Sequence, residues 1–573
     1  MLKQNPGKKN IQMNQKMNKK TRVFIIGLDG ATFDLILPWI REGKLPSLSY
    51  MMENGVYGEL KSTIPILTPT AWSSFMTGKN PGKHGIIGFF TRDKDSYVVK
   101  VVNSTHRSAK EIWTILSEHG KKVGIVNVPL TYPPKNVNGF MITGMMTPPK
   151  SDNFTYPPSL KEEVEKIVGG GTLDPLLTSL EREDVFINEL FGSTEKLAKI
   201  SLLLMEKQEL DFFMTVFNGT DYIQHRFWKH IDPEHPEYEA EKSVKYRKMF
   251  LHFYQKIDEI LGNFLKTADE RTTVIVMSDH GAGLLHKHIH VNSWLIQMGL
   301  LKLKKRLTTR LKCFLYKIGV NPVKIVNALF SIHLGNIRIK TSRTDKKLQD
   351  ISTRLFMSFS DVNWHKTKAY SIGSGIIYIN LKGREPLGTV SPGQEYESLR
   401  EQITTRLYEL KDPETSEFVI EKVYKKEEIF NGPHIDMLPD LVFIPKHGYV
   451  TFEEHGFATN SVITRSKSVS GTHKLNGILI MKGNGIKKSA TLKEASIMDV
   501  APTILYLLGL PIPTDMDGRV LEEALTSSYL RSNPIKYAKE AEDSAGFPSE
   551  KRDEVYKDEE KIKSKLRALG YLP

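Results

Sequence analysis

Short apolar runs alternate with longer amphipathic patterns along most of the chain. The apolar runs predict buried strands, and apolar positions that recur about every three or four residues predict helices. Because strands that alternate with helices usually form a mostly parallel sheet with helices on both faces, we predict an α/β fold. The predicted strands are Val23–Leu28, Val123–Asn127, Phe212–Phe217, Thr273–Met277, Ile376–Ile379, Leu441–Ile444 and Gly477–Met481. The predicted helices are Ala109–His119, Ser159–Ile167, Val185–Leu204, Glu239–Phe264, Tyr396–Tyr408 and Ser496–Leu508.

One segment departs from this pattern. Residues 301–348 contain thirteen Lys and Arg against one acid, and their apolar positions have helical spacing. The segment lies between two regularly patterned regions, so we expect an inserted helical basic cap or lid. A basic amphipathic helix is also a kind of element that contacts membrane surfaces weakly, and this alternative stays open.

The two ends of the chain are set apart by their charge. Residues 1–22 contain seven Lys and Arg, no acid and no apolar periodicity, which indicates a disordered basic tail over 1–21. The segment 528–573 is charge-rich and is predicted to hold a helix that ends near Leu569. The main domain is therefore expected to comprise 22–300 and 349–527, interrupted by the insertion.

Composition narrows the class of protein. The chain has 573 residues, a formal net charge of +14 and a pI of about 9.3, so it favours anionic partners, and no specific nucleic acid partner is predicted. Its single cysteine, Cys313, excludes an internal disulfide and a Cys-rich metal site. No apolar run approaches the roughly 18 residues that span a bilayer, and no secretory signal precedes Val23. These features favour a cytoplasmic protein of undefined oligomeric state.

Candidate chemistry lies near the predicted strand ends. Asp29 follows the first strand and precedes a glycine, where open α/β sheets bind their ligands, although a helix-capping Asp would look the same. Thr68 precedes Pro69, which favours the first helical position, so Thr68 is predicted to cap a helix that runs to about Thr77. The positive end of that helix would favour an alkoxide and a bound phosphate, with plain helix capping as the alternative.

Acids and histidines recur at three further places. Asp221 and His225 are four residues apart, so they share a helical face and would form either a pair of metal ligands or a surface salt bridge. Asp279 and His280 follow a predicted strand and precede a glycine. His473 lies just before the last predicted strand and is by itself an ordinary loop histidine. Oxygen and imidazole ligands without thiolates suit Zn, Mn or Fe, so the conjunction of these residues indicates a metal centre.

Five motifs contain or adjoin these residues in chain order: GLDG, TPTAWSSFMTGKNPGKHGI, TDYIQHRFW, SDHG and GTH. In this order they resemble the alkaline phosphatase superfamily and, within it, the type I phosphodiesterase / nucleotide pyrophosphatase family. INLKGREPLG at 379–388 is similar to a stretch of microbial members. The resemblance covers roughly residues 22–527. It implies an alkaline phosphatase-like fold and a metal-dependent hydrolase of anionic phosphate esters.

The resemblance also implies a role for each candidate residue. It assigns two divalent metal ions, with zinc preferred over Mn or Fe. One ion would be bound by Asp29, Thr68, Asp279 and His280, and the other by Asp221, His225 and His473. Thr68 would also be the nucleophile, in preference to Thr70, because the family nucleophile lies nine residues before the Thr of the Thr77-Gly78 pair. Attack on phosphorus would give a phospho-threonine that water then hydrolyses.

One position departs from the family pattern. Nucleotide pyrophosphatases have a phosphate-binding Asn shortly after the HGI segment, whereas the matching position here is Phe89. That function would be missing, or supplied by His106, Arg107 or Asn127. Phosphomonoester, pyrophosphate and phosphonate substrates therefore stay open beside phosphodiesters, and the substrate-binding residues stay unknown. A sulfatase is disfavoured because Cys313 lacks the nearby Pro and Arg of that motif, and a non-catalytic binding protein that retains the fold is a further alternative.

Overall fold

The computed structural model describes residues 21–93, 95–149, 151–169, 182–317, 357–451, 457, 459–466 and 469–539, together with 559, 562–563 and 566. The predicted basic tail over 1–21, most of the predicted C-terminal helix and residues 318–348 of the predicted insertion lie outside these residues. Among the described helices, none is both long enough and apolar enough to cross a bilayer.

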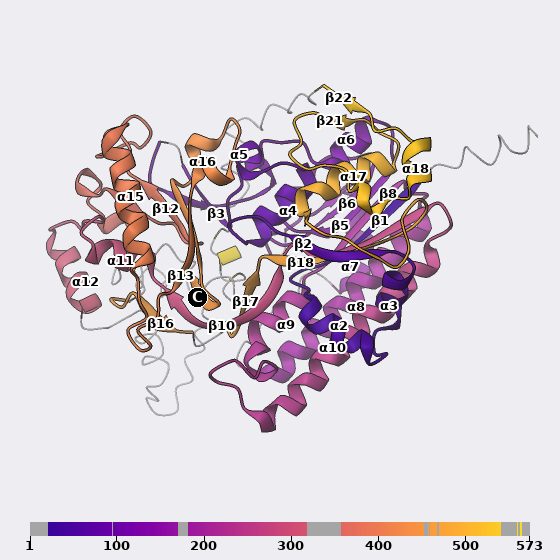
Figure 1. The fold of residues 1–573 in the computed structure, drawn as a ribbon, viewed down its shortest axis with the longest axis horizontal. Coiled ribbons are helices and arrows are strands. Elements are labelled where there is room, and N and C mark those ends of the chain that lie inside the picture. The colour runs from indigo at the N-terminus through magenta and orange to yellow at the C-terminus, as the bar shows by residue number, and fades with distance from the viewer. Residues whose placement is uncertain are drawn as a thin grey trace, which may run out of the picture.

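A ten-stranded sheet forms the centre of the molecule (Figure 1). Its strands follow the order β19-β2-β18-β9-β1-β8-β5-β6-β7, and β20 pairs with β2. β1 is parallel to both β8 and β9, and β5 is parallel to both β6 and β8, whereas β18 is antiparallel to β9. The strands are β1 (Arg22–Leu28), β2 (Val56–Lys61), β5 (Val123–Val128), β6 (Gly139–Thr143), β7 (Thr155–Tyr156), β8 (Phe212–Phe217), β9 (Thr272–Met277), β18 (Asn476–Lys482), β19 (Ala490–Thr491) and β20 (Ala495–Ser496). Most pairings are parallel, which confirms the predicted α/β fold.

Apolar side chains on both faces of the sheet explain why β1 lies inside the molecule. Successive residues of a strand point to opposite faces, so Phe24 and Ile26 enter one apolar core while Val23 and Ile25 enter another. Helices α2, α3, α8 and α10 cover the first face, and α4, α6 and α17 cover the second (Figure 1). These helices are α2 (Phe33–Arg41), α3 (Pro46–Glu53), α8 (Glu183–Lys207), α10 (Ala240–Thr267), α4 (Thr68–Thr77), α6 (Ile112–Glu118) and α17 (Val500–Leu507).

The six helices predicted from apolar periodicity are all present, with at least one end of each shifted. The prediction for Ala109–His119 corresponds to α6, and that for Ser159–Ile167 corresponds to α7 (Leu160–Val168). The prediction for Ser496–Leu508 corresponds to a short 3-10 turn at Ile497–Asp499 followed by α17. The apolar periodicity therefore located each helix, whereas the ends depend on local backbone geometry that periodicity does not report.

Two predicted strands belong to a separate, smaller sheet rather than to the central one. This four-stranded sheet has its own apolar core, to which α11 and α15 contribute. Its strands, in spatial order, are β11 (Ala369–Tyr370), β12 (Ile376–Ile379), β14 (Leu441–Pro445) and β13 (Ile420–Lys425), and its helices are α11 (Val291–Gln297) and α15 (Gln394–Tyr408). The expectation that β12 and β14 join the parallel sheet is wrong because an apolar run reports burial but does not identify the partner strand. β12 and β14 are antiparallel to each other.

A third sheet, which the apolar pattern did not predict, brings two motifs together. Strand β10 (Gly281–Ile289) begins directly after Asp279-His280 and pairs antiparallel with β17 (Gly471–Lys474). In this register Ala282 lies opposite His473. Strands β15 (Gly448–Thr451) and β16 (Ile463–Arg465) also pair with β10. The SDHG and GTH motifs, far apart in sequence, therefore lie side by side.

Within the predicted basic insertion, the structure describes one helix, α12 (Leu307–Lys317). α12 contacts the region around the smaller sheet, where Thr309 Oγ1 donates to Asp361 at 2.8 Å and Tyr316 Oη donates to Ser293 Oγ of α11 at 2.8 Å. The exposed large apolar side chains of α12 are Leu307, Leu311 and Phe314.

A buried ion-pair cluster holds the start of α6. The carboxylate of Glu111 accepts hydrogen bonds from Arg107 Nε at 2.9 Å and from Lys135 Nζ at 2.9 Å. Burial alone would raise the pKa of Glu111, but the charges of Arg107 and Lys135 outweigh burial and lower this pKa to about 2. The ionised carboxylate therefore stabilises the folded chain at neutral pH.

Substitution of Glu111 by Gln should lower the free energy of unfolding at pH 7 by about 3 kcal/mol, because it leaves Arg107 buried without its charge partner. The folded-state pKa lies below the ordinary value of 4.5, so the stabilisation is present above about pH 5 and is lost as the pH falls. Denaturant unfolding of the wild type and the variant at several pH values should show that the difference between their free energies of unfolding narrows from about pH 5 towards pH 3. A difference that does not change with pH would contradict this interpretation.

Candidate metal centre

Six buried or half-buried acidic and histidine side chains form two adjoining groups near the carboxyl ends of the central strands. Within each group, the atoms that could bind a metal ion all lie within 4.8 Å of one another. The first group comprises Asp29, Asp279 and His280, and the second comprises Asp221, His225 and His473. The rings of His280 and His473 stack with their centroids 3.7 Å apart, so the two groups are direct neighbours. The structure thus brings together all six of the predicted acids and histidines.

Asp29 and Asp279 belong to one group because they follow adjacent parallel strands, β1 and β9. Gly30 turns the chain after β1 with a φ of 68°, and a Cβ at this position would lie 2.7 Å from Asp221 Oδ1. Glycine is therefore required both for the turn and for the close approach of the second group. The cap of the following helix α2 is the hydroxyl of Thr32, so the alternative role of Asp29 as a helix cap is wrong.

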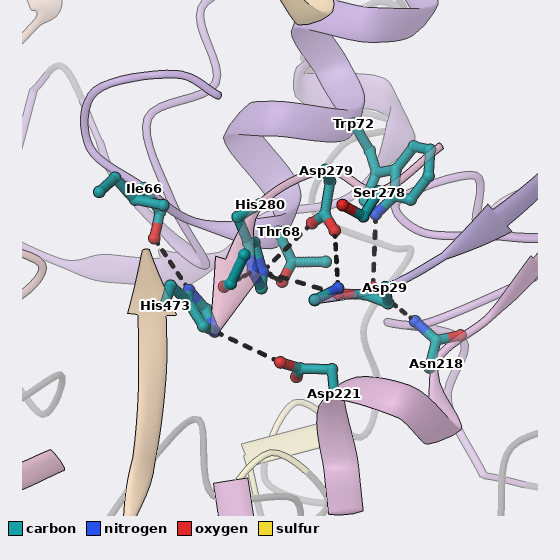
Figure 2. Close-up of polar contacts among 12 residues, drawn as sticks. Asp29, Ile66, Thr68, Trp72, Asn218, Asp221, Ser278, Asp279, His280 and His473 are labelled. Atoms are coloured by element: carbon teal, nitrogen blue, oxygen red, sulfur yellow. Dashed lines mark hydrogen bonds and ion pairs between the residues drawn. The ribbon is translucent and has the colours of Figure 1, made fainter. Parts of the chain in front are cut away.

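Thr68 lies beside the first group, but its place in the helix differs from the prediction. The capping position of α4 is Leu67, so Thr68 is the first helical residue and Pro69 the second. The prediction was off by one residue because proline is compatible with the whole first turn, where no N–H is needed. The Thr68 side chain is fully buried, and Oγ1 lies 3.3 Å from His280 Nε2 (Figure 2). The hydroxyl therefore faces the acids and histidines.

The second group is assembled by α9 (Gly219–Phe227) and β17. Asp221 and His225 lie on successive turns of α9, with Oδ2 and Nε2 3.2 Å apart. Both are buried, which rules out a surface salt bridge. β17 can approach α9 because it begins with Gly471, where a Cβ would lie 2.3 Å from a backbone oxygen of α9. This contact brings His473 Nε2 to 3.0 Å from His225 Nε2.

The three histidines share one hydrogen-bonding pattern, in which Nδ1 contacts a backbone carbonyl. The acceptors are Gly471 O for His225 (2.8 Å), Gly281 O for His280 (3.0 Å) and Ile66 O for His473 (2.9 Å). Because a carbonyl oxygen only accepts, each Nδ1 carries a proton and each Nε2 points into the site, where the neutral imidazole offers its lone pair. Histidines that bind a metal through Nε2 are held in this way.

Burial and like charges perturb the acidic residues of the site. Burial, together with the charges of Asp279 and Asp221, raises the pKa of Asp29 well above its usual range. Burial and Asp221 also raise the pKa of Asp279. Burial would raise the pKa of Asp221 as well, but the charge and the hydrogen bond of His225 outweigh it and lower that pKa. For His473, burial lowers the pKa, which favours the neutral imidazole. Ionisation of both Asp29 and Asp279 is therefore costly unless positive charge lies beside them.

The residues present fit a divalent cation at the first group. Oδ1 of Asp29 and Oδ2 of Asp279 are buried and have no hydrogen-bond partner among the described residues. A buried carboxylate oxygen without a partner is costly, and a cation between the two would compensate both. Carboxylate and imidazole donors without a thiolate suit Zn, Mn and Fe.

Several side chains that support Asp29 were not predicted. Asn218 Nδ2 donates to Asp29 Oδ2 at 2.9 Å, and Trp72 Nε1 donates to the same oxygen at 3.4 Å (Figure 2). Thr220 Oγ1 donates to the backbone oxygen of Asp29 at 2.6 Å. In the sequence, Asn218 and Thr220 have the appearance of residues at the start of a helix, so no local signal connects them with Asp29.

Phe89, at the position where the resemblance led us to expect a phosphate-binding Asn, is buried in the apolar core. The three residues proposed as substitutes, His106, Arg107 and Asn127, each have structural hydrogen bonds. Their partners are Asn103 for His106, Glu111 and Leu130 for Arg107, and Val216 and Asn218 for Asn127. Asn127 is connected to the first group, because Asn218 in turn contacts Asp29.

The fold is alkaline phosphatase-like, with a large mixed α/β sheet and two adjoining groups of potential metal ligands. The family model for type I phosphodiesterase / nucleotide pyrophosphatase matches residues 23–474. The chain therefore belongs to this family and is an enzyme of the phosphoric ester hydrolase class.

Solved structures of the superfamily are similar to this chain over most of its length. Alkaline phosphatase PafA is 14% identical with a TM-score of 0.51, and the comparison covers 89% of this chain and 99% of that one. Murine ectonucleotide pyrophosphatase / phosphodiesterase 5 is 14% identical with a TM-score of 0.47, covering 88% and 100%. Phosphonoacetate hydrolase from Sinorhizobium meliloti is 15% identical with a TM-score of 0.47, covering 85% and 95%. At these identities, the likeness to PafA supports the fold alone.

The cost of ionising two adjacent buried carboxyls in the first group leads to a test on the metal-free protein. Asp29→Asn removes the repulsion from Asp279, and the amide oxygen can still accept from Asn218 and Trp72. We expect the melting temperature of the chelator-treated variant to exceed that of the chelator-treated wild type by about 2 °C or more. Zinc should raise the melting temperature of the wild type much more than that of the variant. Scanning fluorimetry measures both, and a metal-free variant that melts below the wild type would contradict the expected repulsion.

Proposed function

We propose that this protein hydrolyses phosphodiesters or nucleotide pyrophosphates, with Thr68 as the nucleophile and with two divalent metal ions, most readily zinc, in the two groups. The observation that carries the proposal is the position of the Thr68 hydroxyl, which is buried and 3.3 Å from His280 Nε2. Membership of the phosphodiesterase / pyrophosphatase family supports it, and the formal net charge of +14 supports an anionic, phosphate-containing substrate.

In this proposal each part of the chain has a defined role. Asp29, Asp279 and His280, with Thr68, would hold one ion, and the second group would hold the other. When bound, two such ions lower the pKa of a hydroxyl and neutralise charge on the phosphate oxygens. The first turn of α4 has its positive dipole end at Thr68, which stabilises an alkoxide there. Thr68 Oγ1 would attack phosphorus as the P–O bond to the leaving group breaks, and water would then cleave the phospho-threonine.

A phosphomonoesterase or phosphonate hydrolase is the second candidate, and Phe89 favours it. The family Asn at this position donates to a phosphate oxygen, whereas Phe89 is apolar and buried in the core. A diester therefore has one donor fewer than in nucleotide pyrophosphatases. Hydrolysis of p-nitrophenyl phosphate, bis-p-nitrophenyl phosphate and a p-nitrophenyl phosphonate, with Zn, Mn or Fe added after chelation, separates the two candidates. If the metal-loaded protein hydrolysed none of these esters, the result would favour a non-catalytic binding protein that retains the fold.

Thr68→Ala should lower kcat by at least about a thousandfold on the best ester of this panel, because the substitution removes the hydroxyl that attacks phosphorus. The metal content should stay close to that of the wild type, since the six acids and histidines remain. Steady-state kinetics and elemental analysis of the purified variant measure these two quantities.

Thr70→Ala is the matched control for this substitution. Thr70 lies in the same buried turn of α4, so its loss has a similar effect on packing, and activity should stay within about threefold of wild type. If Thr70→Ala abolished turnover and Thr68→Ala did not, Thr70 would be the nucleophile instead.

The two-ion part of the proposal predicts a metal content. The wild type should bind two zinc ions per chain after chelation and reloading, whereas His225→Ala and Asp279→Ala should each bind one tightly, because each substitution removes a ligand from one group. His235→Ala is a suitable control, since His235 is a buried histidine whose Nε2 contacts the Leu285 carbonyl. Elemental analysis that finds a single ion in the wild type would exclude the two-ion site.

A further inference from the structure

Asn218 has an unusual place at the start of α9. It occupies the capping position, where an Asn side chain usually accepts a hydrogen bond from the first turn of the helix. Here the side chain makes no capping hydrogen bond. Its Nδ2 donates to Asp29 Oδ2 at 2.9 Å instead, and its Oδ1 accepts from Asn127 Nδ2 at 2.9 Å. A residue well suited to stabilise α9 is therefore used to hold the carboxylate that follows β1.

Asn127 fixes the orientation of the Asn218 amide. Its Nδ2 donates both to Val216 O at 2.8 Å and to Asn218 Oδ1. Because an amide oxygen accepts and an amide nitrogen donates, this contact leaves the Asn218 nitrogen facing Asp29. Asn127 has a φ of 57°, at the end of β5 where the pairing with β6 shifts register. Asn is among the non-glycine residues that adopt this conformation most readily. Both amides are buried.

The two amides control which oxygen of Asp29 faces the first group. Asn218 and Trp72 both donate to Oδ2. Oδ1 is left without a hydrogen-bond partner among the described residues and lies 3.6 Å from His280 Nε2. Thr220 holds the backbone oxygen of Asp29, so neither the main chain nor the side chain can rotate without breaking a buried hydrogen bond. Asp29 is thus held with a single oxygen directed at the position of the cation.

We infer that Asn218, oriented by Asn127, is a positioning residue that sets the metal affinity of the first group through Asp29. The inference rests on the proposed use of metal ions, and it deepens that proposal by assigning residues outside the ligand set. Loss of a side chain that orients a metal ligand typically lowers metal affinity by about 10- to 100-fold.

The test is a zinc titration of the full chain in competition with a chromophoric chelator. In Asn218→Ala, the affinity of one of the two sites should fall by about 10- to 100-fold, the other should be unchanged, and two ions should still bind at saturating zinc. The matched control is Asn380→Ala. Asn380 is fully buried and its Nδ2 donates to the carbonyls of Trp364 and Thr367, so its loss should lower stability but leave both affinities unchanged.

A second variant keeps the test decisive if Asn218→Ala does not fold. Asn127→Gly retains the left-handed backbone and removes the orienting amide, so it should weaken zinc binding at the same site by a smaller factor. Wild-type affinity at both sites in Asn218→Ala, or an equal loss in Asn380→Ala, would overturn the inference. The readout is independent of turnover. If the variants behave as expected but the wild type hydrolyses no ester, the proposed function fails while the positioning role stands.

Discussion

The burial of three carboxylates beside one another is the constraint around which this protein is built. Asp29, Asp279 and Asp221 are almost completely inaccessible to solvent, and two of their oxygens have no hydrogen-bond partner among the described residues. Such a cluster opposes folding unless positive charge enters it. The apolar cores on the two faces of the central sheet supply the favourable free energy that makes this arrangement possible. The same electrostatic cost gives the site its preference for a cation.

The geometry of the cluster is set by groups that do not point into it. Backbone carbonyls fix the three imidazoles, and the side chains of Asn218 and Trp72 fix one carboxylate. These supports come from different layers of the fold: α4 from one face of the sheet, α9 from the strand ends and β17 from the third sheet. The ligand positions therefore depend on how the layers pack, and a change in packing at a distance would alter the site without touching a ligand.

The sequence was informative where chemistry follows directly from local pattern. An acid after an apolar strand, as at Asp29 and Asp279, lies at the carboxyl edge of a parallel sheet, so this edge could be predicted for both residues. Their adjacency depends on the pairing of β1 with β9. The place of His473 could not, because it depends on the pairing of β17 with β10, and neither strand has a clear apolar pattern. The separate sheet of β12 and β14 was missed for a similar reason, since strand pairing is a non-local property. The role of Asn218 could not be predicted because it depends on a contact with Asp29, 189 residues away in the sequence.

The contacts that complete the site join very distant parts of the chain, and this affects how the protein matures. Thr68 and His280 are separated by 212 residues, and the carbonyl of Ile66 and the ring of His473 by 407. A nascent chain exposes its N-terminal carboxylates and hydroxyl long before the last histidine has left the ribosome. Pairing over such distances is a late and slow event in folding. Metal would thus bind at the end of folding and stabilise the folded chain. Hydrolytic activity would arise only in molecules whose synthesis is nearly complete.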